Sequence, residues 1–121
     1  MGTRYDHMLE IQKEVSDIYS ALSLMGWDQE TYMPQKGATS RGRQLATLSG
    51  IAHTRFTSNE MGDAIEGAGG EALTADEQVN HREIVWSYER SKKLPTELVK
   101  KLAETSSLAI QVWREAREKN D

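Results

Sequence analysis

The sequence predicts an all-α fold, in which about five helices form an antiparallel, bundle-like array with one long packed linker. Three observations support this prediction: the helical spacing of apolar residues, two helix-start patterns, and the lack of any apolar–polar alternation long enough for a strand. The chain has 121 residues, which is the length of one domain. We therefore expect a single helical domain over residues 1–121.

The first helix is expected over residues 5–25. Its apolar residues recur at alternating steps of three and four, which is the spacing of one helix face. This apolar face contains Met8, Ile11, Val15, Ile18, Leu22 and Met25. Gly26 is expected to end the helix, because glycine adopts the left-handed conformation that closes helices at little cost.

Residues 27–44 interrupt the helical pattern and are interpreted as a long linker. The stretch carries more apolar bulk than a solvated loop normally does, so we expect it to be packed down. Its expected anchors are Trp27, Tyr32 and Met33. Pro34 biases the residue before it toward extended backbone, so a helix should not run straight through.

A second helix is expected over residues 38–53. Gly42 and Gly50 are its expected weak points, because glycine lowers helix stability. Its buried side is expected to contain Leu45, Leu48, Ile51 and Ala52.

A third, short helix is expected to begin at Thr57. Thr57 and Glu60 match the capping box, in which a hydroxyl and an acid three residues later satisfy free backbone N–H groups. The helix is expected to end at Gly67, and the glycine-rich residues 67–70 are expected to form a flexible loop.

The fourth helix is expected to begin with a second capping box, Thr74 and Glu77, and to run to about Lys92. A fifth helix follows Pro95 and is expected to continue to the end of the chain, because no glycine marks a stop. Its packed face is expected to contain Leu98, Leu102, Ala109, Trp113 and Ala116.

The composition excludes several classes of protein. A net charge of −4 and a pI of about 5.4 argue against a nucleic-acid partner, which normally requires a basic surface. No apolar run is long enough to span a membrane, and the N-terminus has no signal-peptide core. The chain contains no cysteine, so we expect no disulfides and a cytoplasmic location.

No catalytic motif is present in the sequence. None of the histidines, His7, His53 and His81, opens the His-Glu-x-x-His pattern that places two zinc ligands on one helix face. There is also no phosphate-binding loop and no Gly-x-Ser-x-Gly elbow. We therefore assign no catalytic residue, no metal ligand and no cofactor to this chain.

Several short motifs nevertheless resemble one enzyme family. They are Trp27-Asp28-Gln29-Glu30-Thr31, Met33-Pro34, Gly37, Arg41, Gln44, Leu48 and His53, followed by Tyr88-Glu89-Arg90, Leu94-Pro95, Glu97-Leu98-Val99, Trp113, Ala116-Arg117 and Asn120-Asp121. In order and approximate spacing they resemble the opening helices of the thermostable (Taq-type) metallocarboxypeptidases of peptidase family M32. The resemblance covers nearly the whole chain but only the first part of the longer family protein.

The resemblance implies a role inside a larger enzyme. Proteins similar to this one remove C-terminal residues from peptides with a divalent metal, zinc or cobalt, which a His-Glu-x-x-His helix holds. Those positions are missing here. We therefore expect an N-terminal fragment that is inactive alone, forms part of the wall of the substrate cleft, and has the remainder of the parent carboxypeptidase as its partner. The alternative is a free-standing helical interaction module without catalysis.

The signature residues are the candidate site, either as structural or as cleft-lining residues. They are Trp27, Asp28, Thr31, Met33, Pro34, Gly37, Arg41 and Gln44. Arg41 has two interpretations: it holds substrate charge in the cleft, or it pairs with Asp28 to fix the linker, and we favour the second. Trp27, Met33, Trp86 and Trp113 are expected in the core. A fragment with an uncovered apolar face is expected to self-associate as a symmetric dimer.

Overall fold

The computed structural model describes residues 3–120, and every regular element within them is a helix. In chain order these elements are α1 (Arg4–Thr31), the 3-10 turn η1 (Gln35–Gly37), α2 (Ala38–Phe56), α3 (Asn59–Gly69), α4 (Ala75–Lys92) and α5 (Thr96–Glu118). The prediction of an all-α fold is therefore confirmed. Asp121, the last residue of the sequence resemblance, lies outside the described residues.

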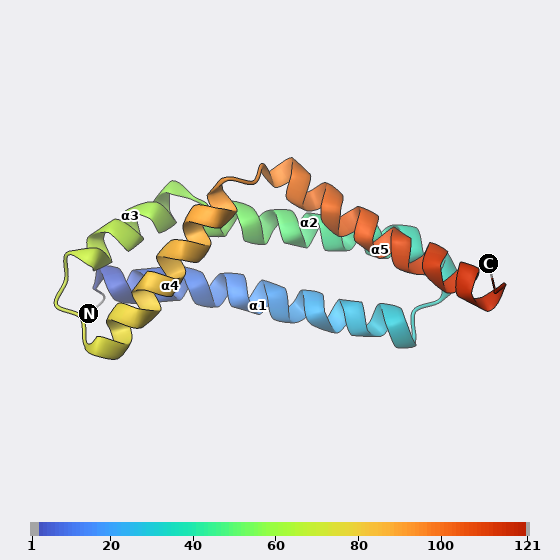
Figure 1. Ribbon diagram of the computed structural model, residues 1–121, viewed down its shortest axis with the longest axis horizontal. Helices are drawn as coiled ribbons and strands as arrows, with labels where there is room; N and C mark the ends of the chain where they lie inside the picture. The colour runs from blue at the N-terminus through green and yellow to red at the C-terminus, as the bar shows by residue number, and fades with distance from the viewer. Residues whose placement is uncertain (1–2, 121) are drawn as a thin grey trace.

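The helices form an elongated array (Figure 1). α1 and α2 run antiparallel as a long hairpin, and α5 runs back along α2. α3 and α4 gather at the N-terminal end of α1, and the two ends of the chain lie at opposite ends of the molecule. None of the helices described over residues 3–120 is both long enough and apolar enough to cross a lipid bilayer.

Two carboxylates fix the N-terminus of α1. The Thr3 side chain accepts a hydrogen bond from the Asp6 N–H, and the Asp6 carboxylate accepts one from the Thr3 N–H. Glu71, in the loop after α3, accepts hydrogen bonds from the N–H groups of Arg4 at 2.9 Å and Tyr5 at 3.1 Å. Negative charge at this end of a helix is stabilising, because free N–H groups point toward it. The loop after α3 is thereby tied to the start of α1.

The prediction that Gly26 ends the first helix is wrong, because α1 continues to Thr31 and Tyr32 forms its C-cap. A Cβ atom at Gly26 would meet nothing within 4 Å. Within residues 3–120, no other part of the chain therefore packs closely enough here to require a glycine. The glycine lowers helix stability by about 1 kcal/mol relative to alanine. The helical turn that follows contains Gln29, which is only 2% exposed and donates two hydrogen bonds to Ser107, and these bonds offset the cost.

The long packed linker over residues 27–44 is not observed. The connection between α1 and α2 spans only residues 32–37 and includes η1. Two of the expected anchors face solvent, since Trp27 is 55% exposed and Tyr32 is 73% exposed. Their rings meet edge to face, with centroids 5.4 Å apart. Met33 is half-buried and lies against Gly37. Apolar bulk alone was a poor guide to burial at the tip of this hairpin.

The apolar core lies around the N-terminal half of α1. Within the predicted stripe of α1, Met8, Ile11 and Val15 are buried, which confirms this part of the prediction. The later members, which are only half-buried, are Ile18, Leu22 and Met25. The core cluster contains Tyr5, Met8, Ile11, Val15, Ala52, Phe56, Met61, Ala64, Ile65, Ala68, Ile84 and Tyr88. α1 to α4 therefore share one core at this end of the molecule.

α2 meets α5 through small residues. A Cβ atom at Gly50 would lie 2.8 Å from Cγ of Lys100, and one at Gly42 would lie 3.6 Å from Cγ of Leu108. The two predicted weak points thus both lie against side chains of α5. The expected buried side of α2 was partly wrong: Ala52 is buried, Leu45 and Leu48 are half-buried, and Ile51 is 51% exposed.

The face of α5 that was expected to pack is turned outward. Leu98 is 43% exposed, Leu102 54% and Trp113 62%. Ser107, on the opposite side of the helix, is buried instead. The expectation that the tryptophans lie in the core is likewise wrong, because Trp27 and Trp86 are also more than half exposed.

α3 begins one residue later than predicted. Ser58 rather than Thr57 forms the N-cap, and its hydroxyl accepts a hydrogen bond from the Met61 N–H at 3.1 Å. α3 also continues past its predicted end to Gly69. Gly67 is therefore helical, and it lies so close to Arg4 that a Cβ atom would come within 2.6 Å of the Arg4 Cγ. Helix packing against α1 thus decides the conformation of residues expected to form a flexible loop.

The ends of α4 and α5 follow recognisable signals. The capping box of Thr74 and Glu77 is present, and α4 ends at Lys92 as predicted. α5 begins after Pro95 and ends at Glu118 rather than continuing to the end of the chain. Asn120 has φ of 60°, which is the left-handed conformation that often follows a helix end, so this asparagine is a stop signal that the sequence reasoning missed.

Candidate functional site

The signature residues gather where α1 leads into α2. In chain order they are Trp27, Asp28 and Thr31 in the last turns of α1, Met33, Pro34 and Gly37 in the connection, and Arg41 and Gln44 in the first turns of α2. A helical hairpin brings these two groups together because its arms are antiparallel and its connection is short.

Arg41 forms the centre of this group. Its Nη1 donates to the Met25 carbonyl at 2.7 Å, and its Nη2 donates to Oδ2 of Asp28 at 2.9 Å. Its Nε lies 3.3 Å from Oε1 of Gln44. The side chain is only 18% exposed, so the guanidinium bridges α1 and α2. The contact with Asp28 agrees with the interpretation of these two residues as a structural pair.

The other signature residues make mainly local contacts. Thr31 donates its hydroxyl to the Trp27 carbonyl at 2.8 Å, which satisfies a backbone acceptor in the last turn of α1. Pro34 precedes η1 with φ of −62°, and Met33 lies against Gly37. These contacts shape the turn between the two helices.

Gln29 is a buried polar residue that the sequence reasoning missed. Its Nε2 donates to the carbonyl of Ser107 at 3.0 Å and to the Ser107 hydroxyl at 2.8 Å. Gln29 is 2% exposed and Ser107 3%, so this contact joins the end of α1 to the middle of α5. A signal was available, because Gln29 follows Met25 by four positions and so extends the apolar stripe of α1.

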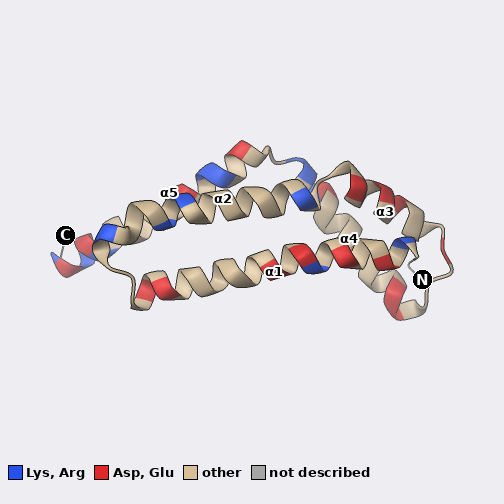
Figure 2. Cartoon of the chain, turned by 180° about the vertical axis from the view of Figure 1, so that it is seen from behind, with Lys and Arg blue, Asp and Glu red and all other residues tan. Residues whose placement is uncertain are grey.

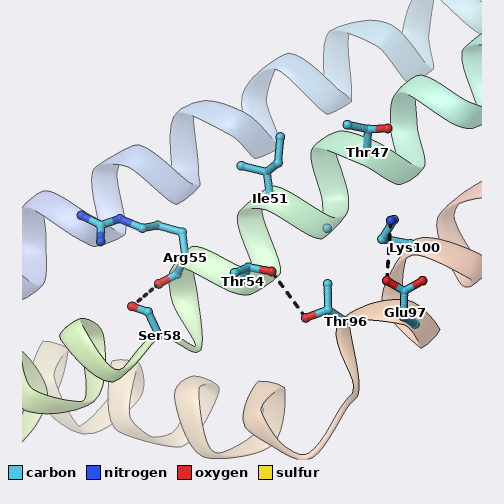
Figure 3. A pocket seen from close by; sticks show the side chains of 9 residues that line it. Thr47, Ile51, Thr54, Arg55, Ser58, Thr96, Glu97 and Lys100 are labelled. Atoms are coloured by element: carbon cyan, nitrogen blue, oxygen red, sulfur yellow. Dashed lines mark hydrogen bonds and ion pairs between the residues drawn. The ribbon is translucent and has the colours of Figure 1, made fainter.

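An open hollow of about 580 Å³ lies between α2 and the start of α5 (Figure 3). Its lining residues are Thr47, Gly50, Ile51, Thr54, Arg55, Ser58, Thr96, Glu97 and Lys100. The cation of Lys100 is 3.7 Å from the Glu97 carboxylate, and the Thr54 and Thr96 hydroxyls are 3.5 Å apart. None of the predicted site residues lines this hollow. These polar groups form no nucleophile–base pair.

Acidic residues gather on α1 and α3 near the N-terminal end of the chain (Figure 2). Arg55 forms ion pairs with two of these acidic residues. Arg55 donates to Glu14 at 2.9 Å and also to Glu60, and His7 Nε2 lies 2.9 Å from Glu60. The hydrogen bonds from Arg55 lower the pKa of Glu14 and of Glu60 below the usual value for glutamate, and they raise the pKa of Arg55. All three groups are therefore charged at neutral pH, and they join α1, α2 and α3.

No metal-binding cluster is found among the residues that the structure describes. Within residues 3–120, no three side chains of the types His, Cys, Asp and Glu come close enough together to hold an ion.

The Arg41 contacts lead to a prediction about stability. We expect Arg41→Ala to lower the free energy of unfolding by about 2 kcal/mol and Asp28→Ala by about 1 kcal/mol, because Arg41 also loses its bond to the Met25 carbonyl. Urea denaturation of both single variants and the double variant would measure the coupling between the two residues. Arg43→Ala, an exposed neighbour, is the control and should change stability by less than about 0.5 kcal/mol. Unchanged stability of Asp28→Ala would rule out the structural interpretation.

Comparison with known proteins assigns the chain to a family. Residues 7–121 match the family model described as carboxypeptidase Taq (M32) metallopeptidase. Thermostable carboxypeptidase 1 of Thermus thermophilus is 37% identical over 121 residues, which cover 97% of this chain and 24% of that protein. Thermostable carboxypeptidase 1 of Pyrococcus furiosus is 33% identical over 102 residues, which cover 84% of this chain and 20% of that protein.

The fold is similar as well. A solved structure described as "The Structure of CHT" matches with a TM-score of 0.73 and 37% sequence identity, and the match covers 98% of this chain and 24% of that one. The chain thus spans about a quarter of the length of the relatives that it matches. Since both the family model and the sequence identity extend over nearly all of its residues, the chain belongs to the carboxypeptidase Taq (M32) metallopeptidase family.

Proposed function

We propose that this chain is the N-terminal helical part of a zinc-dependent metallocarboxypeptidase, which releases C-terminal amino acids from peptides. The observation that carries this proposal is the family match over residues 7–121, together with relatives named as carboxypeptidases that are about four times as long. In this proposal the remainder of the parent enzyme is the partner of the chain. That remainder supplies the zinc or cobalt ion, its ligands and the catalytic base.

The contacts of the signature residues support a scaffolding role in this enzyme. The three side-chain contacts of Arg41 join the last turns of α1 to the first turns of α2. Trp27 and Tyr32, whose rings are exposed at the tip of the hairpin, offer apolar area to the remainder of the enzyme. The hairpin then forms part of the wall beside the substrate, while the hydrolytic chemistry takes place elsewhere.

A chimera tests the proposal directly. This chain would replace the matching quarter of the Thermus thermophilus carboxypeptidase, and release of C-terminal amino acids from a peptide would be measured. We expect the chimera to be active and to lose its activity when a chelator removes the metal, whereas the 121-residue chain alone should release nothing. Metal-dependent release by the chain alone would contradict the proposal.

One observation favours a second candidate function, a helical interaction module without catalysis. The exposed apolar residues of α5, such as Val112 at 67% and Trp113 at 62%, would suit a protein partner as well as they suit the rest of an enzyme. A chimera that folds, binds metal and remains inactive would favour this second candidate.

A further inference from the structure

A crevice of about 260 Å³ lies between α1, α2 and α4. α4 runs from the N-terminal end of α1 toward the C-terminal end of α2 (Figure 1), so side chains of all three helices meet beside the core. The crevice is separate from the hollow between α2 and α5, because the two have no lining residue in common. It therefore has to be considered as a site of its own.

The walls of the crevice suit an aromatic ring. Val15 of α1 and Phe56 of α2 line it and belong to the core, with exposed fractions of only 3% and 8%. Tyr19 of α1 lines it as well and is 49% exposed. Aromatic rings that meet edge to face or with an offset gain more than the burial of their area alone. The crevice therefore favours a ligand with an aromatic body.

Gln12 is a polar residue of the crevice whose acceptor has no donor. Its Oε1 is buried, and no group among residues 3–120 donates a hydrogen bond to it. A buried acceptor without a donor costs about 1–3 kcal/mol. The last torsion of a glutamine side chain is soft, so the amide can turn its oxygen toward the crevice that the side chain lines. A ligand with an N–H or O–H group on its ring removes this cost.

The crevice adjoins a cationic surface at the end of α4. Ser87 and Ser91 line both the crevice and a second hollow of about 590 Å³. Arg90 and Lys93 line this second hollow as well, and neither forms an ion pair with another of residues 3–120. The Cζ atom of Arg90 lies 4.4 Å from the centroid of the Trp86 ring, and such stacking orients a guanidinium while its N–H edge stays free. Two cations and two hydroxyls in one place suit a carboxylate.

We propose that this crevice binds a small aromatic carboxylic acid that carries an N–H or O–H donor on its ring. The ring lies between Phe56 and Tyr19, and its donor binds Oε1 of Gln12. The carboxylate reaches Arg90 and Lys93 past the two serines. The charged head thus stays at the surface, and only the apolar ring and one paired polar group are buried. No metal takes part, so the proposal stands whether or not the chain serves a carboxypeptidase.

Three related probes test the chemistry of the ligand, and the amide chemical shifts of the isotope-labelled chain follow their binding. We expect indolepropionate to cause saturable shifts that centre on Gln12, Ser16, Ser87 and Ser91. Naphthylpropionate, which lacks the ring N–H, and indolepropionamide, which lacks the charge, should each bind about tenfold more weakly, which corresponds to about 1.4 kcal/mol. Shifts centred on the hollow between α2 and α5, or binding of acetate as tight as that of indolepropionate, would overturn the proposal.

Variants of the chain test the individual contacts, and circular dichroism checks that each variant is folded. Gln12→Leu keeps a side chain of similar size but removes the acceptor, so it should bind indolepropionate and naphthylpropionate equally. Arg90→Gln should weaken binding of the acid about tenfold and leave binding of the amide unchanged. Lys101→Gln is the matched control, because Lys101 is an exposed cation of α5 that lines neither hollow, and it should bind as the wild type does. A Gln12→Leu variant that still prefers the indole, or an Arg90→Gln variant that binds the acid normally, would overturn the proposal.

Discussion

Met61→Ala is expected to lower the free energy of unfolding by about 2–5 kcal/mol, which is a large share of the roughly 5–15 kcal/mol that stabilises a typical domain. Met61 is fully buried on α3, and it belongs to the same core cluster as Met8 and Ile11 of α1. Truncation removes buried apolar surface and leaves a cavity that rigid helices on several sides cannot fill. Urea denaturation followed by circular dichroism would measure the loss.

Two control variants separate the cavity from the loss of methionine itself. Met61→Leu keeps most of the volume and should cost less than about 1.5 kcal/mol. Leu24→Ala removes a side chain that is 66% exposed, so it should change stability by no more than about 0.5 kcal/mol. If Met61→Ala were as mild as Leu24→Ala, the core would not lie where α1 and α3 meet.

The part of the fold that could be predicted from the sequence is the part whose signal is local. Met8, Ile11 and Val15 are buried as their spacing predicts. The capping box at Thr74 is present, because a hydroxyl and an acid three residues apart need only their own backbone to form it. Patterns of this kind depend on helix geometry, and distant parts of the chain hardly affect them.

The continuation of α1 past Gly26 could have been predicted, but Gly26 was interpreted as the end of the helix. Gln29 continues the stripe of three- and four-residue steps beyond Gly26, so the helix period itself reached the last turn. Treating glycine as a stop gave too much weight to an intrinsic preference of about 1 kcal/mol. Tertiary contacts such as the bonds from Gln29 to Ser107 outweigh a preference of that size.

The orientation of α5 could not be predicted from its own pattern. An amphipathic helix indicates which face needs cover, but it does not say whether this cover comes from the same chain. Gly42 and Gly50 of α2 let α5 approach closely with its polar face, and such a fit becomes visible only when both helices are placed. For the same reason the Asp28–Arg41 pair could be suggested from residue types, whereas the bond from Arg41 to the Met25 carbonyl could not.

His53 is a buried polar residue whose ring forms hydrogen bonds to two other helices, α4 and α5. It is 6% exposed on α2, and its Nε2 lies 2.9 Å from the Ser91 carbonyl while its Nδ1 lies 2.9 Å from the Thr96 hydroxyl. Because a carbonyl oxygen only accepts, Nε2 donates to Ser91, while Nδ1 and the Thr96 hydroxyl share the second hydrogen bond. One imidazole thus holds the end of α4 and the start of α5 on α2.

His53→Phe is expected to lower the free energy of unfolding by about 1–3 kcal/mol, because the ring volume is kept while two buried hydrogen bonds are lost. Thr96→Val removes only the bond to Nδ1, so it should lower the free energy of unfolding by less than His53→Phe does. Because His53→Phe already removes that bond, the double variant should be about as stable as His53→Phe alone. Hydrogen exchange would locate the effect: amides of α5 should lose more protection than those in the first half of α1, where the core lies. Uniform loss of protection along the whole chain would contradict a local fastening role, since it would mean that α5 and the core unfold as one unit.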